Sequence, residues 1–218
     1  MIEQSALYLL SYHDAFHYFD SLTEPADAKG KKHATEPILA MERKAPIPVE
    51  LWKKPPPGWA KLNSNASFFE SDGTCSWGAI LRNERGEVLM TAWGPLPQCI
   101  NALTAEALGL LNGLRAFIST FAGPIHVEND NAFLVNELNQ SESSKSAISG
   151  IAEDTKSLLN SFQQPVCVKV NRSANRVADA LASLGKSVEG ECVLLGRAPP
   201  CVAEALMHDC KTQNSFSR

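Results

Sequence analysis

The chain has 218 residues, of which 44% are apolar and 20% are charged, and its formal net charge is −4 at pH 7. This balance is ordinary for a globular protein. It excludes a strongly basic nucleic-acid binder, so any contact with a polyanion must be local or metal-mediated. No apolar run approaches the ~18 residues of a membrane span, and the N-terminus lacks the basic start and apolar core of a signal peptide. We expect an intracellular protein, nuclear or cytoplasmic, with no signal or transit segment.

The first 58 residues are predicted to form an N-terminal extension that is largely irregular. Residues 5–22 have the apolar spacing of an amphipathic helix. Residues 23–58 are rich in Pro, Lys and Ala and include "KAPIPVELWKKPPPG". Triple proline excludes a helix or a central strand, so we interpret 23–58 as a linker.

Three antiparallel strands are predicted next, at the start of a domain that spans 59–186. The first is 60–69, where the alternation of side chains in "KLNSNASFF" puts Asn63 and Asn65 on one face. A second strand runs to Arg82 after the turn signal Asp72-Gly73. The turn "NERGE", in which Gly86 is free to take positive φ, leads to the third strand, "EVLMTAWGP".

Helices and two further strands complete the predicted domain. Apolar residues at helical spacing predict an amphipathic helix over 101–120. The elements expected after it are a short strand through Ile125 and Val127, a helix from about Asp130, a helix at 146–162, a strand at 166–170 and a helix at 173–186 that stops at Gly185. The order βββαβααβα implies an α/β fold, a mixed sheet with helices packed on it. Residues 187–218, with a Pro pair and a polar end, are interpreted as a C-terminal appendage.

Three acidic residues occupy suggestive places in this pattern. Glu106 is expected in the first turn of the long helix, Asp130 just after the fourth strand, and Asp179 within the last helix. Glu106 and Asp130 also suit helix N-termini, where the helix dipole favours negative charge, whereas Asp179 has no evident capping role. If the three carboxylates converge, they suit Mg²⁺, which prefers oxygen ligands, and two such ions can clamp a phosphodiester.

Several segments in order resemble the plant reverse-transcriptase-like domains of the ribonuclease H type 1 family, which are retroelement-derived. They are "WKKPPPGWAKLN" at 52–63, "GAILRNERGEVL" at 78–89, "ALTAEALGLLNGLRAF" at 102–117, "HVENDNAFLV" at 126–135 and "NRSANRVADALASL" at 171–184. The resemblance implies a ribonuclease H-like fold, a five-stranded mixed sheet in the order 3-2-1-4-5 with helices on both faces. It also implies an endonuclease, a hydrolase that cleaves the RNA strand of RNA/DNA hybrids with two Mg²⁺ or Mn²⁺ ions.

The family's four metal-binding acids map onto positions 65, 106, 130 and 179. Glu106, Asp130 and Asp179 match, whereas relatives usually have "KLNVDGS" where this chain has "KLNSNAS", so Asn65 replaces the first aspartate. Lys169 occupies the place of a histidine that assists catalysis in relatives. Asn65 supplies a neutral carbonyl oxygen and a donor group in place of a carboxylate. We therefore expect metal binding and turnover to be reduced by orders of magnitude.

Nucleic-acid binding is also implied by the resemblance, through phosphate and 2′-hydroxyl contacts. The candidate contact residues are Asn63, Ser64, Ser67, Arg172 and Arg176. Residues 61–185 contain nine Lys and Arg against twelve Asp and Glu, a net charge of −3, so we expect weak and salt-dependent binding. The alternative for the basic residues is a solvated helix face.

Three hypotheses follow. The chain is a ribonuclease H-like nuclease with weakened or lost activity, a non-catalytic nucleic-acid-binding module, or a functionless retroelement remnant. In each case we expect a monomer. The six cysteines form no CxxC pair, which favours reduced thiols, and the four tryptophans are expected to be core or linker anchors.

Overall fold

Strands β1 (Ala60–Phe68), β2 (Cys75–Arg82) and β3 (Val88–Leu96) open the fold as an antiparallel meander. This computed structural model describes residues 50–141 and 145–211 of the chain. The turn between β2 and β3 places Gly86 at a φ of +85°, the left-handed region that glycine tolerates best. The three strands and this turn agree with the prediction from sequence.

The remaining elements extend the sheet and cover it. In chain order they are α2 (Ala102–Phe117), β4 (Pro124–Asn129), α3 (Ala132–Asn139), α4 (Ser149–Leu159), β5 (Gln163–Lys169), α5 (Arg176–Leu184), β6 (Cys192–Leu195) and α6 (Ala203–Lys211). Strand β4 pairs in parallel with β1 and with β5. The strand order is β5-β4-β1-β2-β3-β6, which contains the expected order 3-2-1-4-5.

The sheet has six strands, so the expectation of five was wrong. The additional strand is β6, which pairs antiparallel with β3 from Met90↔Leu195 to Trp93↔Cys192. It lies beyond 186, in the segment interpreted as an appendage. Its run of only four residues, "CVLL", is too short to show a strand period beside the Pro pair that follows it.

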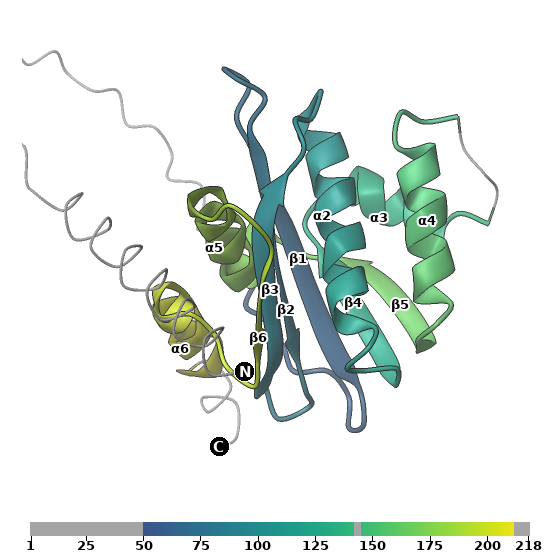
Figure 1. The fold of residues 1–218 in the computed structure, drawn as a ribbon. Coiled ribbons are helices and arrows are strands. Elements are labelled where there is room, and N and C mark those ends of the chain that lie inside the picture. The colour runs from purple at the N-terminus through teal and green to yellow at the C-terminus, as the bar shows by residue number, and fades with distance from the viewer. Residues whose placement is uncertain (1–49, 142–144, 212–218) are drawn as a thin grey trace, which may run out of the picture. The chain divides into compact units, whose positions relative to one another are not determined.

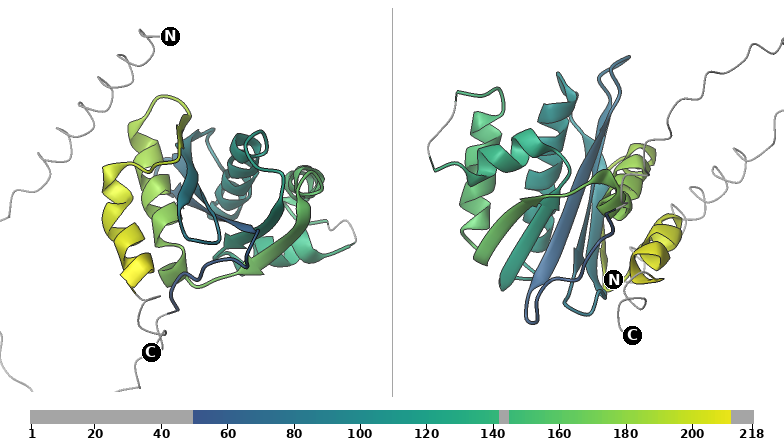
Figure 2. Two further views of the ribbon diagram at one scale, coloured as in Figure 1. Left: turned by 90° about the horizontal axis from the view of Figure 1, so that it is seen from below. Right: turned by 180° about the vertical axis from the view of Figure 1, so that it is seen from behind.

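Helices cover both faces of the sheet, and each face has its own hydrophobic core. Helices α2, α3 and α4 lie on one face, and α5 and α6 on the other (Figures 1 and 2). The larger core lies under α2 and includes Trp77, Leu110 and Leu114. The smaller core includes Trp93 and Leu181 and packs against partly buried residues of α6.

Helix α5 is held very close to the sheet by Gly185. This residue was expected to stop the helix, and it is indeed the C-cap of α5, with a φ of −56°. A Cβ placed on Gly185 would lie 2.7 Å from the carbonyl oxygen of Gly94 in β3. The glycine is therefore required by the close approach of two backbones, not by a left-handed turn.

The N-terminal segment enters the described structure at residue 50. The helix expected at 5–22 lies outside the described residues, as does most of the linker. Residues 50–58 have no helix or strand, as expected, but Trp52 is only 2% exposed. Trp77 and Trp93 are also buried, which confirms their expected place in the core. In the part of the chain that the structure describes, no helix combines the length and apolar character needed to cross a bilayer.

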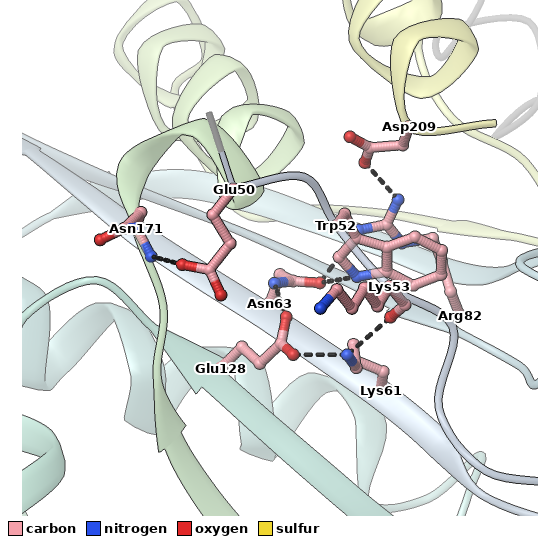
Figure 3. A network of polar contacts seen from close by, with 9 residues as sticks. All are labelled: Glu50, Trp52, Lys53, Lys61, Asn63, Arg82, Glu128, Asn171 and Asp209. Atoms are coloured by element: carbon pink, nitrogen blue, oxygen red, sulfur yellow. Dashed lines mark hydrogen bonds and ion pairs between the residues drawn. The ribbon is translucent and has the colours of Figure 1, made fainter. Parts of the chain in front are cut away.

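Asn63 in β1 organises a buried polar network that holds this N-terminal segment (Figure 3). Its side-chain oxygen accepts a hydrogen bond from the indole of Trp52, at 2.9 Å. Its amide nitrogen donates to Glu128 Oε2 in β4, also at 2.9 Å. Glu128 in turn forms a buried ion pair with Lys61, whose ammonium donates to the carbonyl oxygen of Lys53. The network therefore ties residues 52 and 53 to two central strands.

Arg82 extends the same network to the C-terminal helix. Its guanidinium lies over the Trp52 ring, 3.5 Å from the centroid, and donates to Asn63 Oδ1 at 3.0 Å. Its Nη1 forms an ion pair with Asp209 Oδ2 of α6 at 2.7 Å, and both side chains are 2% exposed. Helix α6 thus supplies the counter-charge for a buried arginine of β2.

The substitution Asp209→Ala should destabilise the protein by about 3–5 kcal/mol, because it leaves the buried Arg82 without its counter-charge. Chemical denaturation followed by circular dichroism measures this loss. The control is Glu87→Ala, which removes the exposed Arg85–Glu87 pair and should cost less than about 1 kcal/mol. Equal losses for the two variants would show that Asp209 does not hold α6 to the sheet.

Candidate functional site

The four positions expected to form one site come from four different elements. Asn65 lies in β1, opposite Gly78 of β2. Glu106 lies in α2, one residue beyond the first turn in which it was expected, because the helix begins at 102. Asp130 follows β4, as expected. Asp179 falls in the first turn of α5, nearer its start than expected, because this helix begins only at 176.

These elements bring the four side chains together. Asn65 Nδ2 donates a hydrogen bond to Asp179 Oδ1 at 2.8 Å. The charge of Asp130 raises the pKa of Glu106, and the charge of Asp179 raises that of Asp130. Such interactions require the carboxylates to be neighbours. The fold therefore places Asn65 against Asp179 and brings Glu106, Asp130 and Asp179 within range of one another's charge.

The side-chain amide of Asn65 can donate a hydrogen bond, whereas an aspartate carboxylate can only accept one. The Asn65 side chain is buried, with 6% of the residue exposed, and its amide group donates to a carboxylate. An aspartate in the same place would repel Asp179 unless a cation lay between them. The Asn65 side-chain carbonyl oxygen is buried without a hydrogen-bond partner.

Glu106 is the acid most perturbed by its surroundings. Burial, more than any other cause, raises its pKa to about 7, with a smaller increase from Asp130. The amide of Asn129 donates to Glu106 Oε2 at 3.2 Å and partly offsets this rise. Glu106 is therefore partly protonated near neutral pH.

Asp130 has a basic partner within the chain. Arg172 Nε lies 3.4 Å from Asp130 Oδ2, although the arginine side chain is 95% exposed. Burial raises the pKa of Asp130, and Arg172 pulls it down. Because the guanidinium is largely in solvent, this ion pair is a weak contact.

Two asparagines that were not predicted as site residues connect the elements that carry the acids. Asn129 and Asn175 are both buried, and both donate to the carbonyl oxygen of Ser64, at 3.1 and 2.9 Å. They hold the end of β4 and the start of α5 against β1. In the sequence, these two asparagines stand in "HVEND" and "SANRVAD", the same segments that contain the predicted site residues Asp130 and Asp179.

Not every predicted contact residue faces solvent. Asn63 and Ser64 are both 0% exposed, and Asn63 belongs to the buried network of Trp52. Ser67 is partly exposed, and Arg172 and Arg176 are exposed. These three are the members of the predicted set that are accessible to a ligand.

Lys169, at the end of β5, is exposed and donates to Asn171 Oδ1 at 3.0 Å. The loop that follows it is tied to the N-terminal segment. The carbonyl oxygen of Glu50 accepts from Ser173 Oγ at 2.6 Å. Its carboxylate accepts from the backbone N–H of Asn171 at 3.4 Å (Figure 3). Glu50 thus contacts both neighbours of Arg172 and positions the loop that reaches Asp130. Nothing in the sequence predicted this contact between residues more than 120 positions apart.

The donor set does not fit a pair of divalent cations as the structure arranges it. Asn65 directs N–H groups toward Asp179, and Asn129 and Arg172 already bind Glu106 and Asp130. Across residues 50–141 and 145–211, no three His, Cys, Asp or Glu side chains are grouped closely enough to hold a metal ion.

Solved structures of several ribonuclease H proteins have a similar fold. The N-terminal ribonuclease H domain of a Mycobacterium tuberculosis protein has a TM-score of 0.53 and 18% identity, over 59% of this chain and 93% of that one. RNase H1 of Halobacterium salinarum has a TM-score of 0.54 and 19% identity, over 59% and 98%. LC11-RNase H1, isolated from compost and solved with an RNA/DNA hybrid, has a TM-score of 0.51 and 15% identity, over 57% and 94%. The chain therefore has a ribonuclease H-like fold.

The family follows from the sequence itself. The family model described as reverse transcriptase-like matches residues 63–185, more than half of the chain, and the chain belongs to this family. No curated protein matches its sequence. Strand β6 and helix α6 lie beyond the matched residues.

The raised pKa of Glu106 predicts a pH dependence of stability. Its pKa is about 7 in the folded protein and near the ordinary 4.3 when unfolded. Between these two pH values the native state therefore binds more protons than the unfolded state. The free energy of unfolding consequently falls as the pH rises through 7. Glu106→Gln should remove up to about 3 kcal/mol of this decline, measured as unfolding free energy at pH 5 and pH 8 with a chelator present.

The exposed Glu189→Gln variant is the control and should keep the wild-type pH profile. An identical decline in Glu106→Gln and wild type would show that Glu106 is not the group responsible.

Proposed function

We propose that this chain is a ribonuclease H-like domain that binds RNA/DNA hybrids and in which hydrolysis is weakened or lost. The observation that carries this proposal is the hydrogen bond from Asn65 to Asp179. It occupies a carboxylate that the family resemblance assigns to metal binding. At the other two acids of the site, Asn129 donates a hydrogen bond to Glu106, and Arg172 forms an ion pair with Asp130.

Electrostatics set the scale of the expected defect. One charge pair at close range is worth roughly 4 kcal/mol at an effective dielectric near 20. Loss of the carboxylate at 65 therefore weakens binding of Mg²⁺ or Mn²⁺ by orders of magnitude, since each ~1.4 kcal/mol is tenfold. Lys169 is a poor replacement for a histidine in proton transfer, because histidine is the side chain suited to exchange protons near neutral pH.

The proposed hybrid binding is supported by the fold and by two exposed arginines. A protein with the same fold, LC11-RNase H1, was solved with an RNA/DNA hybrid. Arg172 and Arg176 lie on the turn and helix that carry Asp179 to the site. Their charges suit phosphate contacts, but the net charge of −3 over 61–185 limits affinity at physiological salt.

Asn65→Asp should raise cleavage of a labelled RNA/DNA hybrid at least tenfold in Mg²⁺ or Mn²⁺, because it restores the missing carboxylate. Wild-type protein should show little or no cleavage in the same assay. Asn101→Asp adds the same charge at the exposed N-cap of α2, where aspartate also caps well, and should change nothing. Efficient cleavage by the wild type would contradict the proposed loss of activity.

A gain in Asn65→Asp should disappear when Glu106→Gln is added. If Asn65→Asp gains nothing, position 65 is not the main defect, and Lys169 or the binding surface also fails.

Filter binding of an uncleaved hybrid at low salt tests the binding half of the proposal. We expect Arg176→Ala to weaken binding and to reduce the slope of log K against log salt by about 1. Arg85→Ala, in the hairpin turn between β2 and β3, should leave both unchanged. No binding by the wild type even at low salt would favour a functionless remnant.

A further inference from the structure

Two of the cysteines lie against each other at one end of the sheet. Cys75 is the first residue of β2, and Cys99 lies three residues beyond the end of β3. Their Sγ atoms are 2.9 Å apart, and both thiols donate to the carbonyl oxygen of Pro97, at 3.0 and 3.2 Å. Both are free cysteines that are buried, with 5% and 7% exposed.

A surface cavity gives one of these thiols access to small molecules. The cavity has a volume of about 580 Å³ and is lined by Cys75 together with Asp72, Gln98 and Lys186. Lys186 is the basic residue of this lining, and Asp72 is the acidic one. Cys99 is not part of the lining, so a small oxidant reaches Cys75 first.

We propose that Cys75 and Cys99 are a reversible oxidation site, in which a peroxide joins the two thiols in a disulfide. A disulfide has an S–S length of about 2.05 Å, so the two sulfur atoms need to approach by less than ~1 Å. The pair is a property of this chain's own sequence and is independent of the proposed hybrid binding.

The chemistry balances with a peroxide as the oxidant. The Cys75 sulfur attacks one peroxide oxygen and the O–O bond breaks. The leaving hydroxide takes the proton of the Cys75 thiol, so that a sulfenic acid and one water form. The Cys99 sulfur then attacks the Cys75 sulfur, the S–O bond breaks, and the departing hydroxide takes the Cys99 proton as a second water. Two thiols and one hydrogen peroxide give one disulfide and two waters.

The environment of Cys99 assigns the order of these steps. Burial, and then the neighbouring Cys75 thiol, raises the pKa of Cys99 to about 12. Cys99 therefore stays protonated until Cys75 has been oxidised, which suits the second, resolving role. Reduction by a dithiol reverses the bond.

The disulfide would tie the start of β2 to the segment that leads into α2. Asn101, two residues after Cys99, is the N-cap of α2, and its side chain accepts from the Thr104 amide. A covalent link between two residues 24 positions apart restricts the unfolded chain and so stabilises the fold. Oxidation should therefore raise the melting temperature by roughly 5–10 °C.

The test treats the full chain, previously reduced, with hydrogen peroxide. Peptide mapping by mass spectrometry should find Cys75 and Cys99 joined, with the loss of two hydrogen atoms, and the melting temperature should rise and then return on addition of dithiothreitol. Cys99→Ser should abolish the rise. Cys201→Ser, which removes an exposed cysteine, should retain it.

Two results would overturn the proposal. One is oxidation of Cys201 under conditions in which Cys75 and Cys99 stay unlinked in the wild type. The other is a melting temperature that rises equally in wild type and Cys99→Ser. Peptide mapping of the wild type needs no variant, so the first result stands even if Cys99→Ser folds poorly.

Discussion

Two buried asparagines on one face of β1 form hydrogen bonds that connect this strand to other parts of the fold. Because side chains alternate along a strand, Asn63 and Asn65 both point to the face covered by α5 and α6. Asn63 joins Trp52, Arg82 and Glu128 in the buried network, and Asn65 donates to Asp179. β1 is also the strand to which both halves of the sheet are attached, through β2 and β4. The two asparagines therefore contact both the buried network that holds residues 52 and 53 and the candidate site.

Asparagine is poorly suited to strands, and each of these residues is retained by the partner it finds. A buried amide is tolerable only when it is hydrogen-bonded. Asn63 makes three such bonds and is satisfied. Asn65 makes one and leaves its side-chain oxygen without a hydrogen-bond partner.

Described residues on both sides of the family match, within 50–62 and 186–211, are part of the folded structure. Strand β6 pairs with the edge of β3, and α6 contributes Asp209 to Arg82. At the other end, Trp52 lies under the Arg82 guanidinium, and Glu50 contacts the loop around Arg172. The loop beside the acids and the C-terminal helix are thus held by the same short stretch, residues 50–53, that precedes the first strand.

Sequence patterns predicted the elements that have a strong period of their own. Alternation in β1 and the apolar face of α2 are local properties, and both elements were predicted within a few residues. Strand β6 was missed because four residues are too few to show a period. The Arg82–Asp209 pair was missed because residues 127 positions apart leave no local signal. The acids of the site were found through spacing and family resemblance, but the partner of Asn65 depends on how α5 packs on β1, and only the structure gives that.

The most direct test of the central claim is a Mn²⁺ titration of the wild-type protein followed by NMR of the asparagine side-chain amides. If the amide of Asn65 takes the place of a cation at Asp179, its resonances should remain sharp as Mn²⁺ is added to millimolar concentration, and those of Asn129 should do the same. Selective paramagnetic broadening of both amides at micromolar Mn²⁺ would show a metal ion bound among Glu106, Asp130 and Asp179. That result would contradict a site whose carboxylates are satisfied from within the chain.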